Sequence, residues 1–322
     1  MRAVCERVLG REWVWPDGTR ESLARYLDNY IEVYYRLGYD CIRLGGGLDF
    51  PSKRRTAEST ARSWVEDGRG VISSWEDFER YPWPDPSKVD LWAYEYVATH
   101  LPEGMGLMVC PSSGVLEIVK NCLMGMETLS YLLYDDPDLV AATFERVGEA
   151  ILGFYKNIVG LPNLRGFFQG DDWGHKTGLL ISAEHLRKYV LPWHKRFAQV
   201  AHEHGLFYFL HSCGNIEEVM PDLLDDVRID GRHSFEDAIT PVWEAKRLYG
   251  DRVAILGGVD MDKLSRLPVD ELRRYVRRIL DECAPGGGYA LGSGNSVADY
   301  VPLENYLAMV EEALLWGGAG AP

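Results

Sequence analysis

The sequence alternates short apolar runs with long amphipathic stretches, and this alternation is the feature that most restricts its fold. It predicts βα units whose strands form a parallel sheet. We expect strands at eight runs, most of which are followed by glycine, proline or a polar cluster: Asp40–Leu44, Val71–Ser73, Gly106–Cys110, Gly166–Gly170, Phe207–His211, Asp230–Ser234, Val253–Gly257 and Gly288–Gly292. Eight such units predict an α/β protein with a single (β/α)8 TIM barrel, whose site lies at the C-terminal ends of the strands.

The chain of 322 residues is long enough for two domains, yet we expect one barrel domain over residues 1–322. Barrels of this class commonly exceed about 250 residues as a single domain. Residues 1–38 and 51–86 do not resemble a barrel unit, and the second stretch is rich in Trp, Ser, Arg and Pro. We therefore expect these two segments to form an N-terminal extension that covers the barrel mouth.

The charge balance excludes several kinds of partner. Lys and Arg total 34 against 49 Asp and Glu, a net charge of −15, which argues against a nucleic-acid or anionic-membrane partner. We also expect no membrane span and no secretory signal, because no long uncharged apolar stretch is present. Six cysteines are too few for a disulfide framework in a chain of this length. These features favour a cytoplasmic protein; they leave its oligomeric state open, with a homodimer as one option.

The sharpest local motif is His211-Ser212-Cys213, which follows the apolar run ending at Leu210. Side chains alternate along a strand, so His211 and Cys213 are expected on the same side. An imidazole and a thiolate at this spacing can bind one Zn²⁺, at roughly 2.0–2.3 Å each. The pair therefore indicates a metal site. The alternative is a buried histidine bonded to a backbone carbonyl beside an inert thiol.

Carboxylates and other polar groups follow the neighbouring strands. Asp171 and Asp172 come directly after the run ending at Gly170, where they could bind a metal, act as a general base or hold a cationic group. Either could instead cap the following turn. Glu236 is a further acid–base or ligand candidate near the same mouth. We expect these three as catalytic residues, and we expect substrate to contact Trp173, His175, Asn215, His233, Ser293 and Asn295.

Several of these segments resemble one enzyme family. Leu180-Ile181-Ser182, Tyr189-Val190-Leu191-Pro192 and the run Phe209–Asn215 resemble the uroporphyrinogen decarboxylase (URO-D) superfamily. They look most like its branch of zinc-dependent cobamide methyltransferases, which includes methylcobamide:coenzyme M methyltransferases. The resemblance covers roughly residue 34 to the C-terminus, and it implies a (β/α)8 barrel with its site at the mouth.

In that branch, a His-x-Cys pair and a later cysteine bind Zn²⁺, which activates a substrate thiol, and the methyl group comes from a corrinoid. His211 and Cys213 match the first two ligands, whereas Ser293 stands at the place of the third. The resemblance therefore implies a zinc ion, a corrinoid as methyl carrier or substrate, and a corrinoid protein as a possible partner. Asp171, Asp172 and Glu236 are the candidates to replace the missing cysteine.

These observations lead to one hypothesis and two alternatives. The first hypothesis is a metal-dependent methyltransferase that uses a corrinoid or demethylates a small methylated compound. An alternative is a metal-free decarboxylase of the URO-D type, with Asp171 or Asp172 moving a proton. The decarboxylases of the family carry an aspartate after the first barrel strand, and Leu44–Gly47 contains none. The other alternative is a non-catalytic barrel that binds a corrinoid or a tetrapyrrole.

Overall fold

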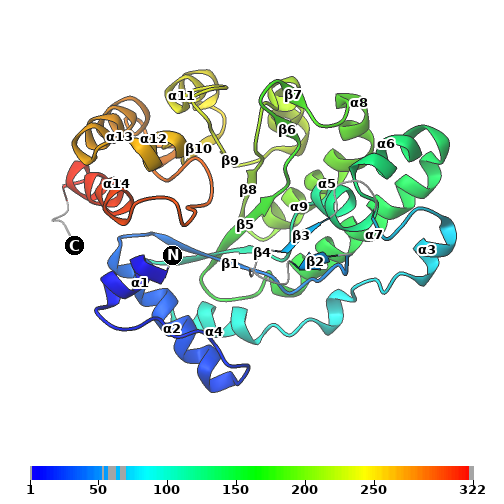
Figure 1. The fold of residues 1–322 in the computed structure, drawn as a ribbon, viewed down its shortest axis with the longest axis horizontal. Helices are drawn as coiled ribbons and strands as arrows, with labels where there is room; N and C mark the ends of the chain where they lie inside the picture. Colours follow the sequence, from blue (N-terminus) through cyan, green and yellow to red (C-terminus); the bar gives the residue numbers. More distant parts are fainter. Residues whose placement is uncertain (1, 53, 57–62, 66–69, 319–322) are drawn as a thin grey trace.

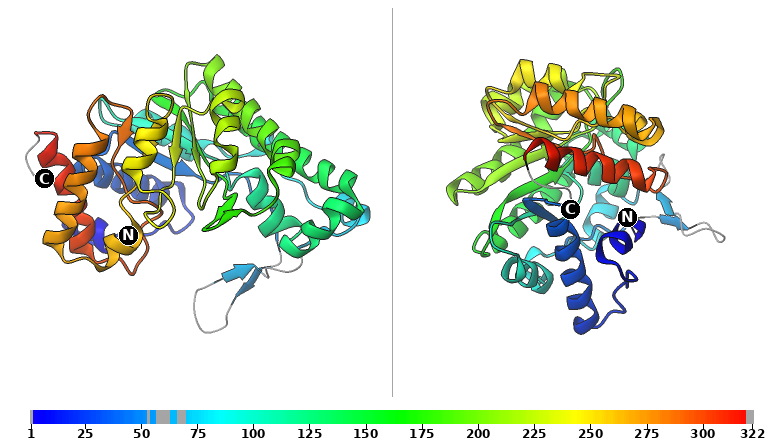
Figure 2. Two further views of the ribbon diagram at one scale, coloured as in Figure 1. Left: turned by 90° about the horizontal axis from the view of Figure 1, so that it is seen from above. Right: turned by 90° about the vertical axis from the view of Figure 1, so that its left-hand side faces the viewer.

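The computed structural model describes residues 2–52, 54–56, 63–65 and 70–318. Its centre is a parallel sheet whose seven strands follow the order β1 (Cys41–Gly45), β4 (Gly106–Cys110), β5 (Leu164–Gly170), β8 (Phe207–His211), β9 (Gly231–His233), β10 (Ala254–Leu256) and β11 (Tyr289–Ala290). Figures 1 and 2 show the sheet curling around a concave face, with β1 and β11 at its edges. The α/β barrel class is thus confirmed, in the form of an open half-barrel.

Helices cross over between successive strands and cover the convex face of the sheet (Figure 1). The longer ones are α4 (Trp92–His100), α6 (Met126–Asp135), α7 (Pro137–Ile158), α9 (Leu191–Glu203), α11 (Val242–Tyr249), α13 (Val269–Cys283) and α14 (Leu303–Trp316). Shorter segments are α3 (Trp75–Arg80), α5 (Val115–Ile118), α8 (Ala183–His185), α10 (Met220–Asp222) and α12 (Met261–Arg266). Two hairpins, β2 (Arg54–Thr56) with β3 (Ser63–Val65) and β6 (Gly174–His175) with β7 (Gly178–Leu179), lie outside the sheet.

One of the eight expected strands is wrong. The run Val71–Ser73 forms no strand, because its backbone amides bond elsewhere: those of Val71 and Ile72 donate to the carbonyl of Leu123 at 2.5 and 2.8 Å. The side chain of Ile72 is fully buried in the core. A run of three residues can therefore enter the core as a loop, without a neighbouring strand.

Side chains alternate between the two faces of the sheet, and this alternation separates the core from the site. On the convex face, Ile42, Phe167 and Leu210 are fully buried beneath the helices. The next residue of each strand points into the concave face, where Phe168 and His211 are only half-buried. Residues such as these, near the carboxyl ends of the strands, are the ones available to a ligand.

The N-terminal helices α1 (Arg2–Leu9) and α2 (Arg20–Arg36) pack beside the sheet edge formed by β1. Helix α2 contacts β1 and α4, and Trp13 is buried against Tyr26, with ring centroids 5.2 Å apart. The hydroxyls of Tyr39 and Tyr306 meet at 2.8 Å, which ties the end of this segment to α14. The expected cover over the barrel mouth is not confirmed, and residues 53, 57–62 and 66–69 of the second segment lie outside the described residues.

Candidate metal site

The loop after β8 brings His211 and Cys213 to one point. The Sγ of Cys213 lies 3.4 Å from the Nε2 of His211. Gly214 follows with φ of +78°, a left-handed conformation that lets the chain turn away at once. The same-side geometry expected from strand alternation is therefore present in the structure.

Asp172 joins this pair from the loop after β5. Its Oδ1 accepts a hydrogen bond from the Cys213 amide at 2.8 Å and lies 3.5 Å from the Nε2 of His211. One ligand atom from each of the three residues lies within 4.8 Å of the other two, and no other such group occurs among the described His, Cys, Asp and Glu side chains. We refer to Asp172, His211 and Cys213 as the ligand cluster.

The spacing of the ligand cluster suits a zinc ion. Zinc binds nitrogen, sulfur and carboxylate oxygen at about 2.0–2.3 Å in a tetrahedral arrangement, so that two ligand atoms lie roughly 3.3–3.8 Å apart. The distances of 3.4 and 3.5 Å from His211 fall in this range. Three protein ligands are also the usual number in a catalytic zinc site, where the fourth position is open to substrate.

His233 sets the orientation and the tautomer of His211. Its Nε2 is 3.0 Å from the carbonyl oxygen of Ser293, which can only accept, so this nitrogen carries the proton. Burial lowers the pKa of His233 to about 3, and the neutral ring therefore presents a lone pair at Nδ1. The Nδ1 of His211 lies 2.5 Å from it and must donate. In the neutral ring of His211, the Nε2 is thus the nitrogen without a proton, and it faces Asp172 and Cys213, as a metal ligand requires.

The pKa values of the two other members of the ligand cluster shift in opposite directions. Burial raises the pKa of the Cys213 thiol to about 12, and the neighbouring charge of Asp172 adds to this shift. Burial by itself raises the pKa of Asp172 as well, but the proximity of His211 and the hydrogen bond from the Cys213 amide lower it to about 2. The free thiol therefore stays protonated at neutral pH, and a bound cation would favour its thiolate.

Asp171, the neighbour of Asp172, lies outside the ligand cluster. Its carboxylate is completely buried and accepts from the amides of Leu116 and Glu117, at 3.1 and 2.9 Å, at the start of α5. Its Oδ2 also lies 2.9 Å from the Nε2 of His194. All of these contacts are internal to the fold, so the structure places Asp171 where it caps a helix and not where substrate could reach it.

The remaining expected site residues divide into two groups. Asn295 donates to the Sγ of Cys213 at 3.2 Å, and Ser293 donates its hydroxyl to the Asn295 carbonyl oxygen at 2.6 Å. Glu236 is close enough to raise the pKa of Cys213, but it is not among the three residues of the ligand cluster. Together with His233, these residues lie around the cluster.

Three expected substrate contacts lie away from the ligand cluster. Trp173 is fully buried against His194, with ring centroids 4.9 Å apart. His175 is exposed in the hairpin of β6 and β7, where its Nδ1 accepts from the Thr177 amide at 3.1 Å. The side chain of Asn215 accepts from the Glu217 amide at 3.1 Å. Each has a local structural contact that accounts for its position.

Two residues near the ligand cluster escaped the sequence analysis. Glu117 lies in the first turn of α5, and burial, followed by the charges of Asp171 and Asp172, raises its pKa to about 7. A carboxyl with that pKa is a candidate general acid or base. Arg43 lies in the middle of β1 with its side chain exposed. A charged residue inside an apolar strand run was the signal that could have identified it.

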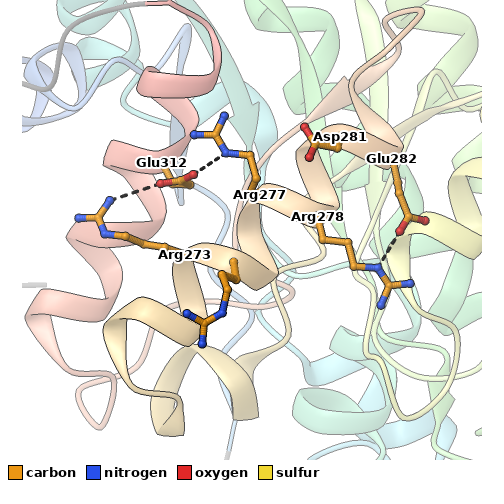
Figure 3. A pocket seen from close by; sticks show the side chains of 7 residues that line it. Arg273, Arg277, Arg278, Asp281, Glu282 and Glu312 are labelled. Carbon is orange, nitrogen blue, oxygen red and sulfur yellow. Dashed lines mark hydrogen bonds and ion pairs between the residues drawn. The ribbon is translucent and has the colours of Figure 1, made fainter.

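A surface hollow lies between α13 and α14, away from the ligand cluster (Figures 1 and 3). Three of its arginines pair with acidic side chains. Arg277 pairs with Glu312 at 2.6 Å, and Arg278 pairs with Glu282 at 2.6 Å. Arg273 pairs with Glu311 and Glu312. The pairs of Arg273 and Arg277 join α13 to α14, whereas Arg278 and Glu282 pair within α13. We therefore assign the hollow to helix packing.

The fold agrees with the comparisons to known proteins. The family model described as Uroporphyrinogen decarboxylase (URO-D) matches residues 70–314, and the chain belongs to this family. A methylated-thiol–coenzyme M methyltransferase of Methanosarcina mazei is 27% identical over 60% of this chain and 49% of its own length. A uroporphyrinogen decarboxylase of Syntrophotalea carbinolica is 28% identical over 57% of this chain and 50% of its own.

The chain thus spans about half the length of the curated relatives it matches. Among solved structures, a methyltransferase from Methanosarcina mazei superposes with a TM-score of 0.65 over 97% of this chain and 90% of its own, at 18% identity. This likeness establishes the fold. The described helices include none that is both long and apolar enough to cross a membrane.

Proposed function

We propose that this chain is a zinc-dependent methyltransferase, which passes a methyl group between a corrinoid and a heteroatom of a small molecule. The convergence of Asp172, His211 and Cys213 on one point is the observation that carries this proposal. The similarity to a methyltransferase that acts on methylated thiols supports it. A corrinoid protein is the partner we propose as the methyl carrier.

Asp172, His211 and Cys213 would hold the zinc ion, which acts when bound as a Lewis acid that lowers the pKa of a substrate thiol or hydroxyl. Asp172 would supply the third ligand, because Ser293 stands at the place of the later cysteine of the methyltransferase branch. His233 keeps the Nε2 of His211 unprotonated, and Asn295 fixes the direction of the Cys213 sulfur by its hydrogen bond. His233 and Asn295 therefore orient two of the three ligands before a metal or substrate binds.

A metal-free decarboxylase accounts less well for the site. The end of β1 carries Gly45, Gly46 and Gly47, so no carboxylate is present at the place where the decarboxylases of the family use one. Such a reaction would also leave the ligand cluster without a role. No observation favours a barrel that only binds a tetrapyrrole.

The zinc content of the purified protein tests the proposal. We expect about one zinc ion per chain in the wild type, and a large loss in Cys213→Ala and in Asp172→Ala. Cys41→Ala is the matched control, because Cys41 lies at the start of β1, at the opposite end of the sheet. Zinc that stays absent after reconstitution, or stays unchanged in both site variants, would overturn the metal assignment.

A further inference from the structure

The side-chain amide of Asn295 is bonded to the sulfur of Cys213, and a second hydrogen bond fixes its orientation. The Nδ2 of Asn295 donates to the Sγ of Cys213 at 3.2 Å. The Oδ1 of Asn295 accepts from the backbone amide of Ser296 at 2.7 Å. Because only the carbonyl oxygen of a side-chain amide can accept from an N–H group, the nitrogen is the atom that faces the sulfur.

The loop that carries Asn295 is anchored to two neighbouring loops. The Ser293 carbonyl oxygen accepts from the Nε2 of His233 at 3.0 Å. The Gly294 amide donates to the Val259 carbonyl oxygen at 2.7 Å. These two bonds hold the backbone directly before Asn295, so its side chain starts from a set position.

Ser293 directs its hydroxyl along its own loop. This hydroxyl donates to the Asn295 carbonyl oxygen at 2.6 Å, which further fixes the backbone of Asn295. Ser293 stands at the place of the later cysteine of the methyltransferase branch. Where that branch has a ligand, this loop thus has a residue that holds the loop, and a hydrogen-bond donor to the sulfur follows two residues later.

A hydrogen bond to a thiolate changes what the sulfur offers to a metal. An N–H donor beside an anion takes up part of its negative charge, and such a bond is roughly twice as strong as one between neutral groups. Hydrogen bonds to the sulfur are among the factors that tune cysteine-ligated metal centres. Cys213 is the single sulfur of the ligand cluster, so a change at this atom affects all of the charge that sulfur can give to the metal.

We propose that Asn295 is a positioning residue of the metal site, whose hydrogen bond to Cys213 limits the charge that this sulfur donates to the metal. This inference rests on the proposed function and goes beyond the orientation of the sulfur. A divalent cation that receives less charge from its protein ligands is a stronger Lewis acid toward a substrate in the open position. Asn295 therefore acts on the reaction through Cys213, without touching the substrate.

Cobalt(II) in place of zinc tests this inference, because the thiolate-to-cobalt charge-transfer band reports the charge on the sulfur, whereas zinc has a filled d shell and gives no such band. Two variants remove the N–H donor. Asn295→Asp keeps the oxygen that accepts from the Ser296 amide, and Asn295→Ala loses this oxygen but adds no charge. We expect the band at longer wavelength in both variants than in the wild type.

The affinity for zinc gives a second measurement. Loss of a residue that orients a metal ligand commonly weakens metal binding by about 10–100-fold. We expect a loss of this size in Asn295→Ala, measured by competition with a zinc chelator.

Ser296→Ala is the control, because Ser296 is exposed and bonds to Asn295 through its backbone amide, which the substitution retains. Its charge-transfer band and its zinc affinity should match those of the wild type. A band that stays in place in both Asn295 variants, or that shifts equally in Ser296→Ala, would overturn the role of Asn295 and leave the metal site standing. A wild-type protein that binds neither cobalt nor zinc would overturn the proposed function, and this inference with it.

Discussion

Asp171 and Asp172 are adjacent in the chain, yet their carboxylates point in different directions and have different partners. The carboxylate of Asp171 is buried among the amides at the start of α5 and the ring of His194. Asp172 reaches His211 and the Cys213 amide on the open side. The sequence predicts that this pair marks a strand end, but it cannot tell which carboxylate faces the site, because that depends on how the loop leaves β5.

This difference predicts opposite effects of two identical substitutions. Asp171→Asn removes one acceptor from a buried network, which should lower the free energy of unfolding by about 2–3 kcal/mol, and the folded protein should still bind zinc. Asp172→Asn should lower the free energy of unfolding by less than about 1 kcal/mol, because the carboxylate of Asp172 is partly exposed. The same substitution should weaken zinc binding. Urea unfolding and zinc analysis of both variants provide the measurement; equal stability losses would contradict the assignment.

At the scale of elements, the strands that could be predicted are those with long apolar runs and a clear stop. Seven of the expected runs coincide with strands of the sheet, and β4 matches its expected bounds of Gly106–Cys110. The first residue of α7, Pro137, follows Asp136, whose side chain caps the helix at the Leu139 amide. The prediction of a strand at Val71–Ser73 was wrong because the amides of Val71 and Ile72 bond to a carbonyl that is distant in the sequence. A local sequence pattern cannot reveal such a partner.

The ligand cluster was predictable only in part, because most of its contacts join segments that are distant in the sequence. His211 and Cys213 come from one strand end, so their spacing in the sequence is sufficient to pair them. Asp172, His233 and Asn295 arrive from three other segments, and their contacts depend on the register of β5, β8 and β9. Arg43 was overlooked because it lies within a strand and not after one.

The turn after β8 leads to a prediction about Gly214. A Cβ atom there would lie 2.2 Å from the backbone of Gly174 in β6, at a φ of +78°. Gly214→Ala should therefore lower the free energy of unfolding by about 2–4 kcal/mol and reduce zinc binding. Gly205→Ala is the matched control, since Gly205 has a φ of +68° with no atom within 4 Å of its Cβ position, and it should cost only about 1–2 kcal/mol.

Urea unfolding of the two alanine variants separates the backbone strain, which they share, from the steric clash, which only Gly214→Ala has. Equal costs would mean that the hairpin of β6 and β7 moves aside without resistance. The position of Cys213 would then depend less on this contact than the structure indicates.

At the scale of the whole molecule, an open half-barrel exposes a concave face that a closed barrel would fill with side chains. The ligand cluster lies at the carboxyl ends of β5 and β8, near the middle of the strand order, and Asn295 follows the edge strand β11. The curvature of the sheet brings the two together. The metal site that we propose thus lies in the fold of the family, with a ligand set in which a carboxylate would take the role of a cysteine.

X-ray absorption at the zinc K-edge of the purified protein tests this central claim most directly. The account predicts one sulfur ligand at about 2.3 Å, from Cys213, with nitrogen and oxygen ligands at about 2.0–2.2 Å, from His211 and Asp172. The sulfur contribution should disappear in any zinc that remains bound to Cys213→Ala. A zinc shell with two or more protein sulfurs, or with none, would contradict the ligand set described for this chain.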